Sequence, residues 1–299
     1  MKTHLSGPIL RLVKTTPRLT RCGLDVIARL LSTRKPHWLL RRIASEVNYR
    51  VPVDVRLGNG MKIRVVWVDV VGREICTRGY YEPGTVKVIR EFLKPGMVFI
   101  DLGAQVGQYT LLAAGLGATV HSFEPDTETF RLLRHNVSAN GLANVRVNPC
   151  AVAERCKRAI FYSGKSDNIG VSSLRQSEDS SVTYEVECVS LDAYVERSHI
   201  PRVDLVKIDV EGAELEVLQG ARKLLGGPGK PHLIVEFCEN NQAAFDSSSA
   251  KLEESFRSLG YELFRIEGSG LTRYRPRVPE EEYFNVLAVP EISGIGIHP

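Results

Sequence analysis

The chain has 299 residues, of which 43% are hydrophobic, which is enough apolar sequence for a buried core in one large or two small domains. The net charge is only +4, but residues 1–50 contain eleven Lys or Arg and two acidic side chains, so the remainder is net acidic. No apolar run approaches the roughly 20 residues that span a bilayer, and no secretory signal core is recognisable, which predicts a cytoplasmic protein.

Residues 1–50 are predicted to form a basic helical extension. Two stretches with helical spacing lie on either side of Pro36, and they contain Leu24, Ile27, Ala28 and Leu31, then Leu39, Leu40, Ile43 and Val47. The favoured interpretation is an arm that packs on its own domain or on a second copy, which leaves a homo-oligomer open. The alternatives are a peripheral contact with an anionic membrane or an acidic partner, and a mitochondrial-type presequence. A nucleic-acid partner is not expected, because aromatic residues are not interleaved with these charges.

The six cysteines are expected to be small buried thiols in a reducing compartment. They are scattered at positions 22, 76, 150, 156, 188 and 238, and no pair has the Cys-x-x-Cys spacing of a structural zinc site. This pattern argues against both a disulfide framework and a zinc module.

Residues 51–75 are predicted to form a β-hairpin cap, followed by the main domain over residues 76–292. The hairpin strands are expected at Val53–Leu57 and Lys62–Val68, because the Gly58-Asn59-Gly60 turn between them supplies the positive φ angles that tight hairpins need. A helix is expected from Thr85 to Leu93, and it leads into the central strand of the main domain.

The stretch from Met97 to Pro125 indicates a nucleoside site. An apolar strand, residues 97–100, ends on the glycine-rich sequence from Asp101 to Gly107, and a helix and a second strand, residues 119–123, follow and end at Glu124. Gly103 and Gly107 allow a sharp bend and a close ligand. Glu124 lies near the distance in sequence at which an acid on the second strand accepts hydrogen bonds from ribose hydroxyls.

Asp101 distinguishes between nucleosides. A dinucleotide loop reads Gly-x-Gly-x-x-Gly, whereas this one reads Asp-x-Gly-x-x-x-Gly. A carboxylate repels a pyrophosphate but suits an ammonium, as in the aminoacyl group of S-adenosylmethionine. The sequence therefore predicts S-adenosylmethionine as the cofactor, with Asp101 near its ammonium.

The remaining pattern predicts an α/β fold with a doubly wound, mostly parallel sheet and an antiparallel edge. The expected helices cover residues 126–140, 213–225 and 250–258, and the expected strands cover residues 144–148, 203–208, 232–237, 261–266 and 284–289. Val152, after the strand at 144–148, is placed near the adenine. A strand pair between residues 158 and 189 brackets a Ser-rich loop at 163–181, which is either a substrate contact or an insertion without a role.

These motifs together resemble the FkbM family of class I S-adenosylmethionine-dependent methyltransferases, over roughly residues 75–240. The similar segments are Tyr81-Glu82-Pro83-Gly84, the loop at 101–107, Ser122-Phe123-Glu124-Pro125 and Lys207-Ile208-Asp209-Val210-Glu211-Gly212-Ala213-Glu214. The resemblance implies a Rossmann-like fold, Tyr81 and Glu82 near the cofactor, and an acceptor hydroxyl on a sugar or a polyketide-like metabolite. Gln105 departs from the family, which usually has Asn there, so a changed reach is expected.

Acidic residues at the strand ends are the candidate catalytic groups. Asp101, Glu124, Asp209 and Glu236 are expected to project from neighbouring strands into one crevice. Asp209 is the first candidate for the base that removes the acceptor proton, with Glu211 and Glu236 second and third. Capping of the next helix by Asp209 or Glu211 is the structural alternative. A divalent cation such as Mg²⁺ held by Asp209 and Glu236 is a further hypothesis.

The sequence predicts methylation of a small-molecule or glycan hydroxyl. Amino-directed methyltransferases usually carry Asn or Asp followed by Pro-Pro and an aromatic residue, which the Asp209-Val210-Glu211-Gly212 segment lacks. The rival interpretations are a non-catalytic nucleoside-binding module, a methyltransferase acting on a protein or a nucleic acid, and an NAD-dependent dehydrogenase.

Overall fold

The computed structural model describes residues 52–66, 69–164, 173–175, 180–268, 270–276 and 283–291. The basic helices expected in residues 1–50 lie outside these ranges, as do Val68 and most of the loop expected at 163–181. Those expectations stay predictions.

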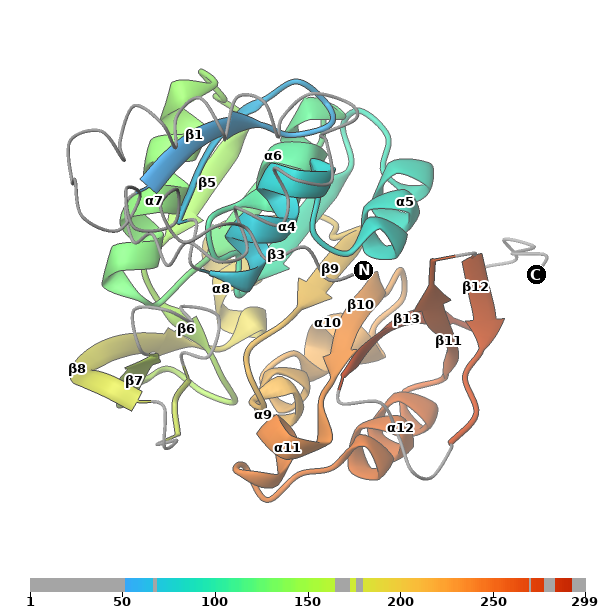
Figure 1. Cartoon of the computed structure of the whole chain (residues 1–299). Helices are drawn as coiled ribbons and strands as arrows, with labels where there is room; N and C mark the ends of the chain where they lie inside the picture. Colours follow the sequence, from blue (N-terminus) through green and yellow to red (C-terminus); the bar gives the residue numbers. More distant parts are fainter. Residues whose placement is uncertain are drawn as a thin grey trace, which may run out of the picture.

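An eight-stranded mixed sheet forms the centre of the molecule, in the order β12-β11-β13-β10-β9-β3-β4-β5 (Figure 1). Five neighbouring strands are parallel: β10 (His232–Phe237), β9 (Leu205–Ile208), β3 (Val98–Leu102), β4 (Thr119–Phe123) and β5 (Val145–Asn148). The antiparallel strands are β13 (Phe284–Pro290), β11 (Tyr261–Glu267) and β12 (Gly270–Arg273). The predicted mostly parallel sheet is confirmed, and its antiparallel edge contains three strands.

Helices cover both faces of this sheet, because its parallel strands are apolar on both sides. Phe99 and Val120 pack in one core cluster with α5 (Pro83–Phe92), α6 (Gln108–Gly115) and α7 (Thr127–Ala139). Ile100 and Val206 pack in the other with α8 (Leu191–Arg197), α9 (Glu214–Gln219), α10 (Arg222–Gly226) and α12 (Ser249–Ser258). In Figure 1, α5, α6 and α7 lie in the upper part of the molecule, and α9, α10 and α12 lie in the lower part. The sheet is therefore doubly wound, as predicted.

The predicted hairpin is present as β1 (Pro52–Arg56) and β2 (Lys62–Val66). Val53 and Val65 are buried in the same core cluster as Phe99 of the central sheet. Helix α4 (Val70–Arg78) follows, with Asp69 accepting a hydrogen bond from the Gly72 amide at its start. The sequence did not predict this helix, and the boundary expected at residues 75 and 76 falls inside it.

A second, three-stranded sheet projects beside the central one, in the order β6 (Ala151–Val152), β8 (Ser180–Val189) and β7 (Lys157–Gly164). The strand pair expected between residues 158 and 189 is thereby confirmed. Asp126, the N-cap of α7, accepts hydrogen bonds from Ser163 Oγ at 2.7 Å and from the Tyr184 hydroxyl at 2.9 Å. These contacts fix the small sheet near the end of β4.

The single helix expected at residues 213–225 is wrong, because the chain forms two short helices there, α9 and α10. The break follows Gly220, where an added Cβ would lie 2.2 Å from the Ala153 carbonyl oxygen. The close approach of the small sheet thus interrupts a helical pattern that looks continuous in the sequence. Helices α8 and α11 (Glu239–Ala243) were also not predicted.

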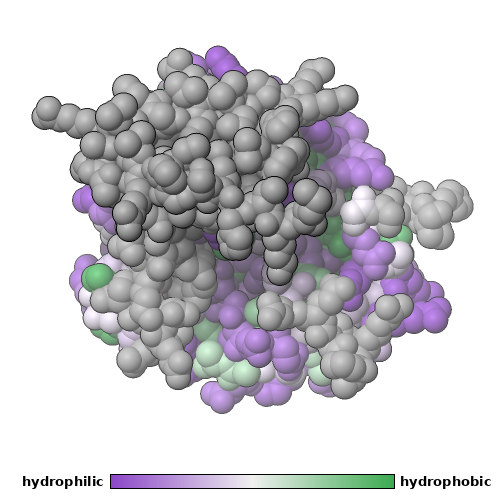
Figure 2. Space-filling view, in the orientation of Figure 1, coloured by the Kyte–Doolittle hydropathy of each residue, from purple (hydrophilic) through white to green (hydrophobic). Residues whose placement is uncertain are grey.

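The described cysteines are all free thiols, and Cys76, Cys150 and Cys188 are buried. Within the described ranges no helix is both long and apolar enough to cross a bilayer. On the face that Figure 2 displays, the described surface is mostly hydrophilic with isolated hydrophobic residues.

Candidate active site

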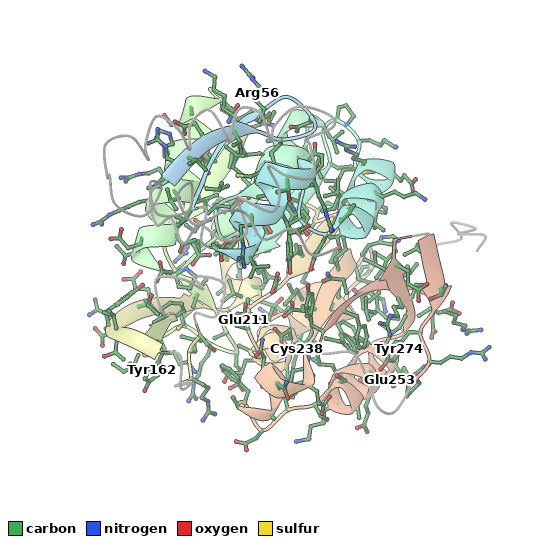
Figure 3. All side chains as sticks on the ribbon, viewed as in Figure 1. Arg56, Tyr162, Glu211, Cys238, Glu253 and Tyr274 are labelled. Atoms are coloured by element: carbon green, nitrogen blue, oxygen red, sulfur yellow. The ribbon has the colours of Figure 1, made fainter. Side chains whose placement is uncertain are left out.

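A cavity of about 670 Å³ lies beyond the carboxyl ends of the parallel strands, where open α/β sheets bind their ligands. Its wall contains seven of the residues predicted to form the site, namely Gly103, Gln105, Glu124, Val152, Asp209, Glu211 and Glu236. In Figure 3, Glu211 lies near the middle of the molecule, between the labelled Tyr162 of the small sheet and Cys238 after β10.

The glycine loop between β3 and α6 has three residues with positive φ. They are Gly103 at 75°, Gln105 at 48° and Gly107 at 92°. A Cβ on Gly103 would lie 1.7 Å from the Asp209 carbonyl oxygen, and one on Gly107 would lie 2.6 Å from Leu133 Cδ1. Gly103 therefore requires glycine for both its backbone angle and the lack of space beside a backbone atom, whereas Gly107 is favoured by its backbone angle.

Glu124 at the end of β4 is connected to this loop through its carboxylate. One oxygen accepts a hydrogen bond from the Gln105 amide at 2.9 Å, and the other accepts from the Asp126 amide at 2.8 Å. Burial raises the pKa of Glu124 to about 8, although the two amides oppose that rise. Each carboxylate oxygen keeps lone-pair capacity directed at the cavity, which fits a group with two neighbouring hydroxyls.

The segment after β5 supplies the apolar part of the same wall. Cys150, Ala151 and Val152 line the cavity, together with Pro125 next to Glu124. Since β5 is the strand beside β4, these small side chains lie where the sequence placed the adenine of a nucleoside.

Asp101 does not project into the crevice as the sequence predicted. Its carboxylate is fully buried, is not part of the cavity wall, and accepts a 2.6 Å hydrogen bond from Thr110 Oγ1 on α6. Burial raises its pKa, against the opposing effects of Lys207 and Thr110. The side chain points from β3 toward α6, so Asp101 lies behind the loop and supports it.

A buried lysine is the functional residue that the reasoning on the sequence did not single out. Lys207 is 1% exposed, its Nζ lies 2.6 Å from Asp209 Oδ2, and it stands 4.8 Å from the centre of the Tyr109 ring. Burial alone lowers the pKa of Lys207, but the carboxylates of Asp209, Glu82 and Asp101 raise it above its ordinary value. Its signal in the sequence is the one positive charge inside the apolar strand predicted at Val203–Ile208.

Glu211 and Glu236 are the other two acids of this side of the cavity. Glu211 has φ of 54°, and its Oε2 accepts a 2.6 Å hydrogen bond from Asn241 Nδ2. Burial first, and then repulsion by Asp209, raises the pKa of both Glu211 and Glu236 well above the ordinary range. Their carboxyl groups are thus better bases than exposed ones once they are ionised.

Helix α9 has no side-chain cap, so neither Asp209 nor Glu211 caps it, and the nearest carboxylate contact is made by Glu214 to the turn before the helix. Its Oε1 accepts from the Gly212 amide at 3.0 Å, and burial raises its pKa to about 7. The side chains of Asp209 and Glu211 are consequently free of that task and face the cavity.

The magnesium hypothesis gains no support from this geometry. Asp209 Oδ2 already binds the Lys207 ammonium. In the part of the chain that the structure describes, no three His, Cys, Asp or Glu side chains are grouped so that they could hold a metal ion.

Two tyrosines form the rim of the cavity. The Tyr81 hydroxyl donates to the Tyr283 hydroxyl at 3.2 Å, although the two residues are far apart in sequence. Gln108 holds Tyr81 in place, because its side chain accepts from the Tyr81 amide at 2.6 Å and donates to the Tyr81 carbonyl at 3.0 Å. Glu82 next to it has φ of 45° and accepts from the Tyr109 hydroxyl at 2.6 Å.

The doubly wound sheet, the glycine loop and the acid at the end of the second strand are features of α/β domains that bind a nucleoside. The sequence model of the Methyltransferase FkbM domain matches residues 101–263. The chain belongs to this FkbM methyltransferase family.

Three curated proteins are similar to this chain in sequence. The chain is 30% identical over 199 residues to "31-O-demethyl-FK506 methyltransferase FkbM" of Streptomyces tacrolimicus, covering 56% of this chain and 74% of that protein. It is 27% identical to "Hexuronic acid methyltransferase AglP" of Haloferax volcanii, covering 56% and 67% of the two chains. It is 26% identical to "2-O-methyltransferase NoeI" of Sinorhizobium fredii, covering 47% and 65%.

Proposed function

We propose that this protein transfers a methyl group from S-adenosylmethionine to a hydroxyl group of a small molecule or a glycan. The observation that carries the proposal is the Glu124 carboxylate, which is tied to the Gln105 amide of the glycine loop and faces a cavity that also contains Asp209 and Glu236. A ribose gripped at Glu124 would place the rest of the ligand toward β9 and β10.

The donor fits the residues of this wall. Gly103 brings the loop backbone into the wall, Glu124 offers acceptors for two ribose hydroxyls, and Cys150 to Val152 offer an apolar surface for the base. S-adenosylmethionine supplies, when bound, an electrophilic methyl group on a positively charged sulfur. The acids of the cavity outnumber its one lysine among the described residues, and a bound cation would favour the ionised form of these carboxyl groups.

Glu236 is the carboxylate that we assign to the acceptor proton. Asp209, the first candidate from sequence, already has one oxygen occupied by the Lys207 ammonium. The Glu236 carboxyl has no hydrogen-bond partner among the described residues, and its pKa is raised by burial. Glu236 therefore receives the hydroxyl proton as the acceptor oxygen attacks, while Asp209 and Lys207 orient the acceptor.

The relatives support a hydroxyl acceptor. One is named a 2-O-methyltransferase, and another is named for a hexuronic acid. Tyr81 and Tyr283 at the rim, with the amides of Asn240 and Asn241 in the wall, offer an aromatic surface and hydrogen-bond donors of the kind that a polyhydroxylated acceptor uses.

Two measurements test this proposal in order. Calorimetry should detect binding of S-adenosylhomocysteine to the wild-type chain and a loss of at least about tenfold in Glu124→Ala, whereas binding of NAD alone would contradict the donor assignment. Incubation with donor labelled in its methyl group, with glycan and small-molecule extracts as acceptors, should then give a base-stable methyl ether. If the label appears in a protein or a nucleic acid instead, the proposed small-molecule or glycan acceptor is wrong.

The choice of base has its own test. Glu236→Gln should lower turnover with a detected acceptor by about 10²–10⁴-fold while S-adenosylhomocysteine affinity stays near wild type. Asp209→Asn should weaken acceptor binding more than turnover. If Asp209→Asn lowers turnover by the larger factor, the base is Asp209.

A further inference from the structure

Helix α7 contacts two parts of the molecule that are distant in sequence, the β1–β2 hairpin and the glycine loop. Asn136 Oδ1 accepts from the Arg64 amide at 2.7 Å, and its Nδ2 donates to the Arg64 carbonyl at 3.0 Å. Asn140 repeats this pattern with Lys62, at 2.9 Å and 2.7 Å. The two side-chain amides pair with β2 as a third strand would.

The repeat follows from matched spacings. Residues four apart on a helix are separated by about 6.0 Å along its axis, and residues two apart on a strand by about 6.6 Å. Asn136 and Asn140 can therefore reach Lys62 and Arg64 with the same geometry. The backbone groups on the outer edge of β2 are satisfied in this way, and the hairpin is fixed against α7.

Only one of the two asparagines also reaches the donor site. Asn136 Nδ2 donates a second hydrogen bond, at 2.8 Å, to the carbonyl of Val106 inside the glycine loop. Asn136 is 1% exposed, so neither partner can be replaced by water without opening the contact. Asn140 makes its remaining hydrogen bond to the Asn136 carbonyl, within the helix.

The loop needs such a contact, because it holds a backbone conformation that side-chain-bearing residues rarely adopt. Gln105 has φ of 48°, which costs of order 1 kcal/mol and persists only when neighbouring contacts enforce it. The Gln105 amide donates to Glu124 on one side of the residue, and Val106 is held by Asn136 on the other.

We propose that Asn136 is a positioning residue that couples the docked hairpin to the glycine loop, so that affinity for the methyl donor depends on the hairpin being in place. Without the Asn136 amide, the Val106 carbonyl loses its donor and Gln105 relaxes toward negative φ. That rotation moves the Gln105 amide off Glu124 and disturbs the carboxylate that grips the ribose. The inference rests on the donor site proposed above.

Asn140 provides the matched control. Asn136→Ala and Asn140→Ala both remove one amide pair from the edge of β2, so both should lower the thermal unfolding midpoint. S-adenosylhomocysteine affinity, measured by calorimetry on the full chain, should fall about tenfold in Asn136→Ala and less than twofold in Asn140→Ala. Equal affinities in Asn136→Ala and wild type, or equal losses in both variants, would overturn the coupling.

A second measurement needs no variant, because coupling between two sites is reciprocal. Saturating S-adenosylhomocysteine should slow hydrogen exchange of the wild-type amides in β2, around Arg64, as well as in the loop at residues 103–107. Slower exchange in the loop with unchanged exchange in β2 would overturn the inference and leave the donor site standing. No binding to the wild-type chain would remove both.

Discussion

The two halves of the cavity treat buried carboxylates in opposite ways. On the β3–β4 side, Glu124 accepts one backbone hydrogen bond at each oxygen, from Gln105 and Asp126. On the β9–β10 side, Asp209 binds the Lys207 ammonium and Glu211 accepts from the Asn241 side chain, while the Glu236 carboxyl has no hydrogen-bond partner among the described residues. Both sides lie at the carboxyl ends of the parallel strands and line the same cavity.

The difference follows from what each half has to do. Backbone amides cannot rotate away as side chains can. The half of the cavity around Glu124 is therefore preorganised for one ligand, which we propose to be the methyl donor. Carboxyl groups that are short of partners keep a raised pKa, and a group that must accept a proton needs that property. The β9–β10 half, which would receive the acceptor, therefore leaves its carboxyl groups dependent on side chains, whereas the β3–β4 half, which would hold the donor, fixes Glu124 with two backbone amides.

The largest expected effect tests the half of the cavity around Glu124 and the glycine loop. Gly103→Ala introduces both an unfavourable φ, costing about 1 kcal/mol, and a Cβ that would lie 1.7 Å from the Asp209 carbonyl oxygen. Because the loop must move away from β9, S-adenosylhomocysteine binding should disappear in calorimetry, and urea unfolding should show a loss of several kcal/mol.

Gly141→Ala is the control for the backbone angle alone. Gly141 has φ of 63° and no atom within 4 Å of an added Cβ, so this variant should lose only about 1 kcal/mol of stability and keep its donor affinity. A Gly103→Ala variant that binds as tightly as Gly141→Ala would mean that the loop is adaptable, and the contrast between the two halves would not hold.

The next effect tests the β9–β10 half of the cavity, where Lys207 and Asp209 form a side-chain pair. Lys207→Met keeps the apolar stem but leaves Asp209 without its partner, and breaking a buried pair costs about 3–5 kcal/mol. Unfolding in urea should show this loss, while the affinity of the folded protein for S-adenosylhomocysteine should change less than threefold.

The Lys223–Glu196 pair serves as the reference, because both side chains are more than three-quarters exposed. Lys223→Met should change stability by less than about 1 kcal/mol. Similar losses in the two variants would show that burial adds nothing at Lys207, and a large loss of donor affinity in Lys207→Met would show that the halves are not independent.

Local patterns predicted the parts of this site that depend on neighbours in sequence. The apolar strand before Asp101, the glycines that follow it and the acid after the next strand are all set by short stretches of chain. The structure places Glu124 beside the glycine loop and Asp209 and Glu236 in the cavity wall, as the positions of their strand ends indicated.

Contacts between distant segments could not be predicted in the same way. Strand periodicity assigns Asp101 to a strand end but does not say that Thr110 on α6 takes its carboxylate. The break after Gly220 depends on the Ala153 carbonyl, and the role of Asn136 depends on a hairpin 72 residues away. In each case the deciding partner comes from another layer of the fold.

The smallest expected effect concerns the proton on Glu124. With a pKa of about 8, its carboxyl group is mostly protonated at pH 7 and mostly ionised at pH 9. Each oxygen already accepts one amide, so a proton on either oxygen occupies a lone pair that a ribose hydroxyl needs. S-adenosylhomocysteine affinity should therefore rise about tenfold between pH 7 and pH 9.

Glu124→Gln separates this titration from that of the ligand and of the acids near Lys207. The amide cannot ionise, so its weaker affinity should lack the rise that the wild-type chain gains through pH 8. If the two pH profiles run parallel, Glu124 does not change its charge on binding. Glu124 would then bind the donor in its protonated form, and a raised pKa would no longer distinguish the carboxyl groups near β9 and β10 from Glu124.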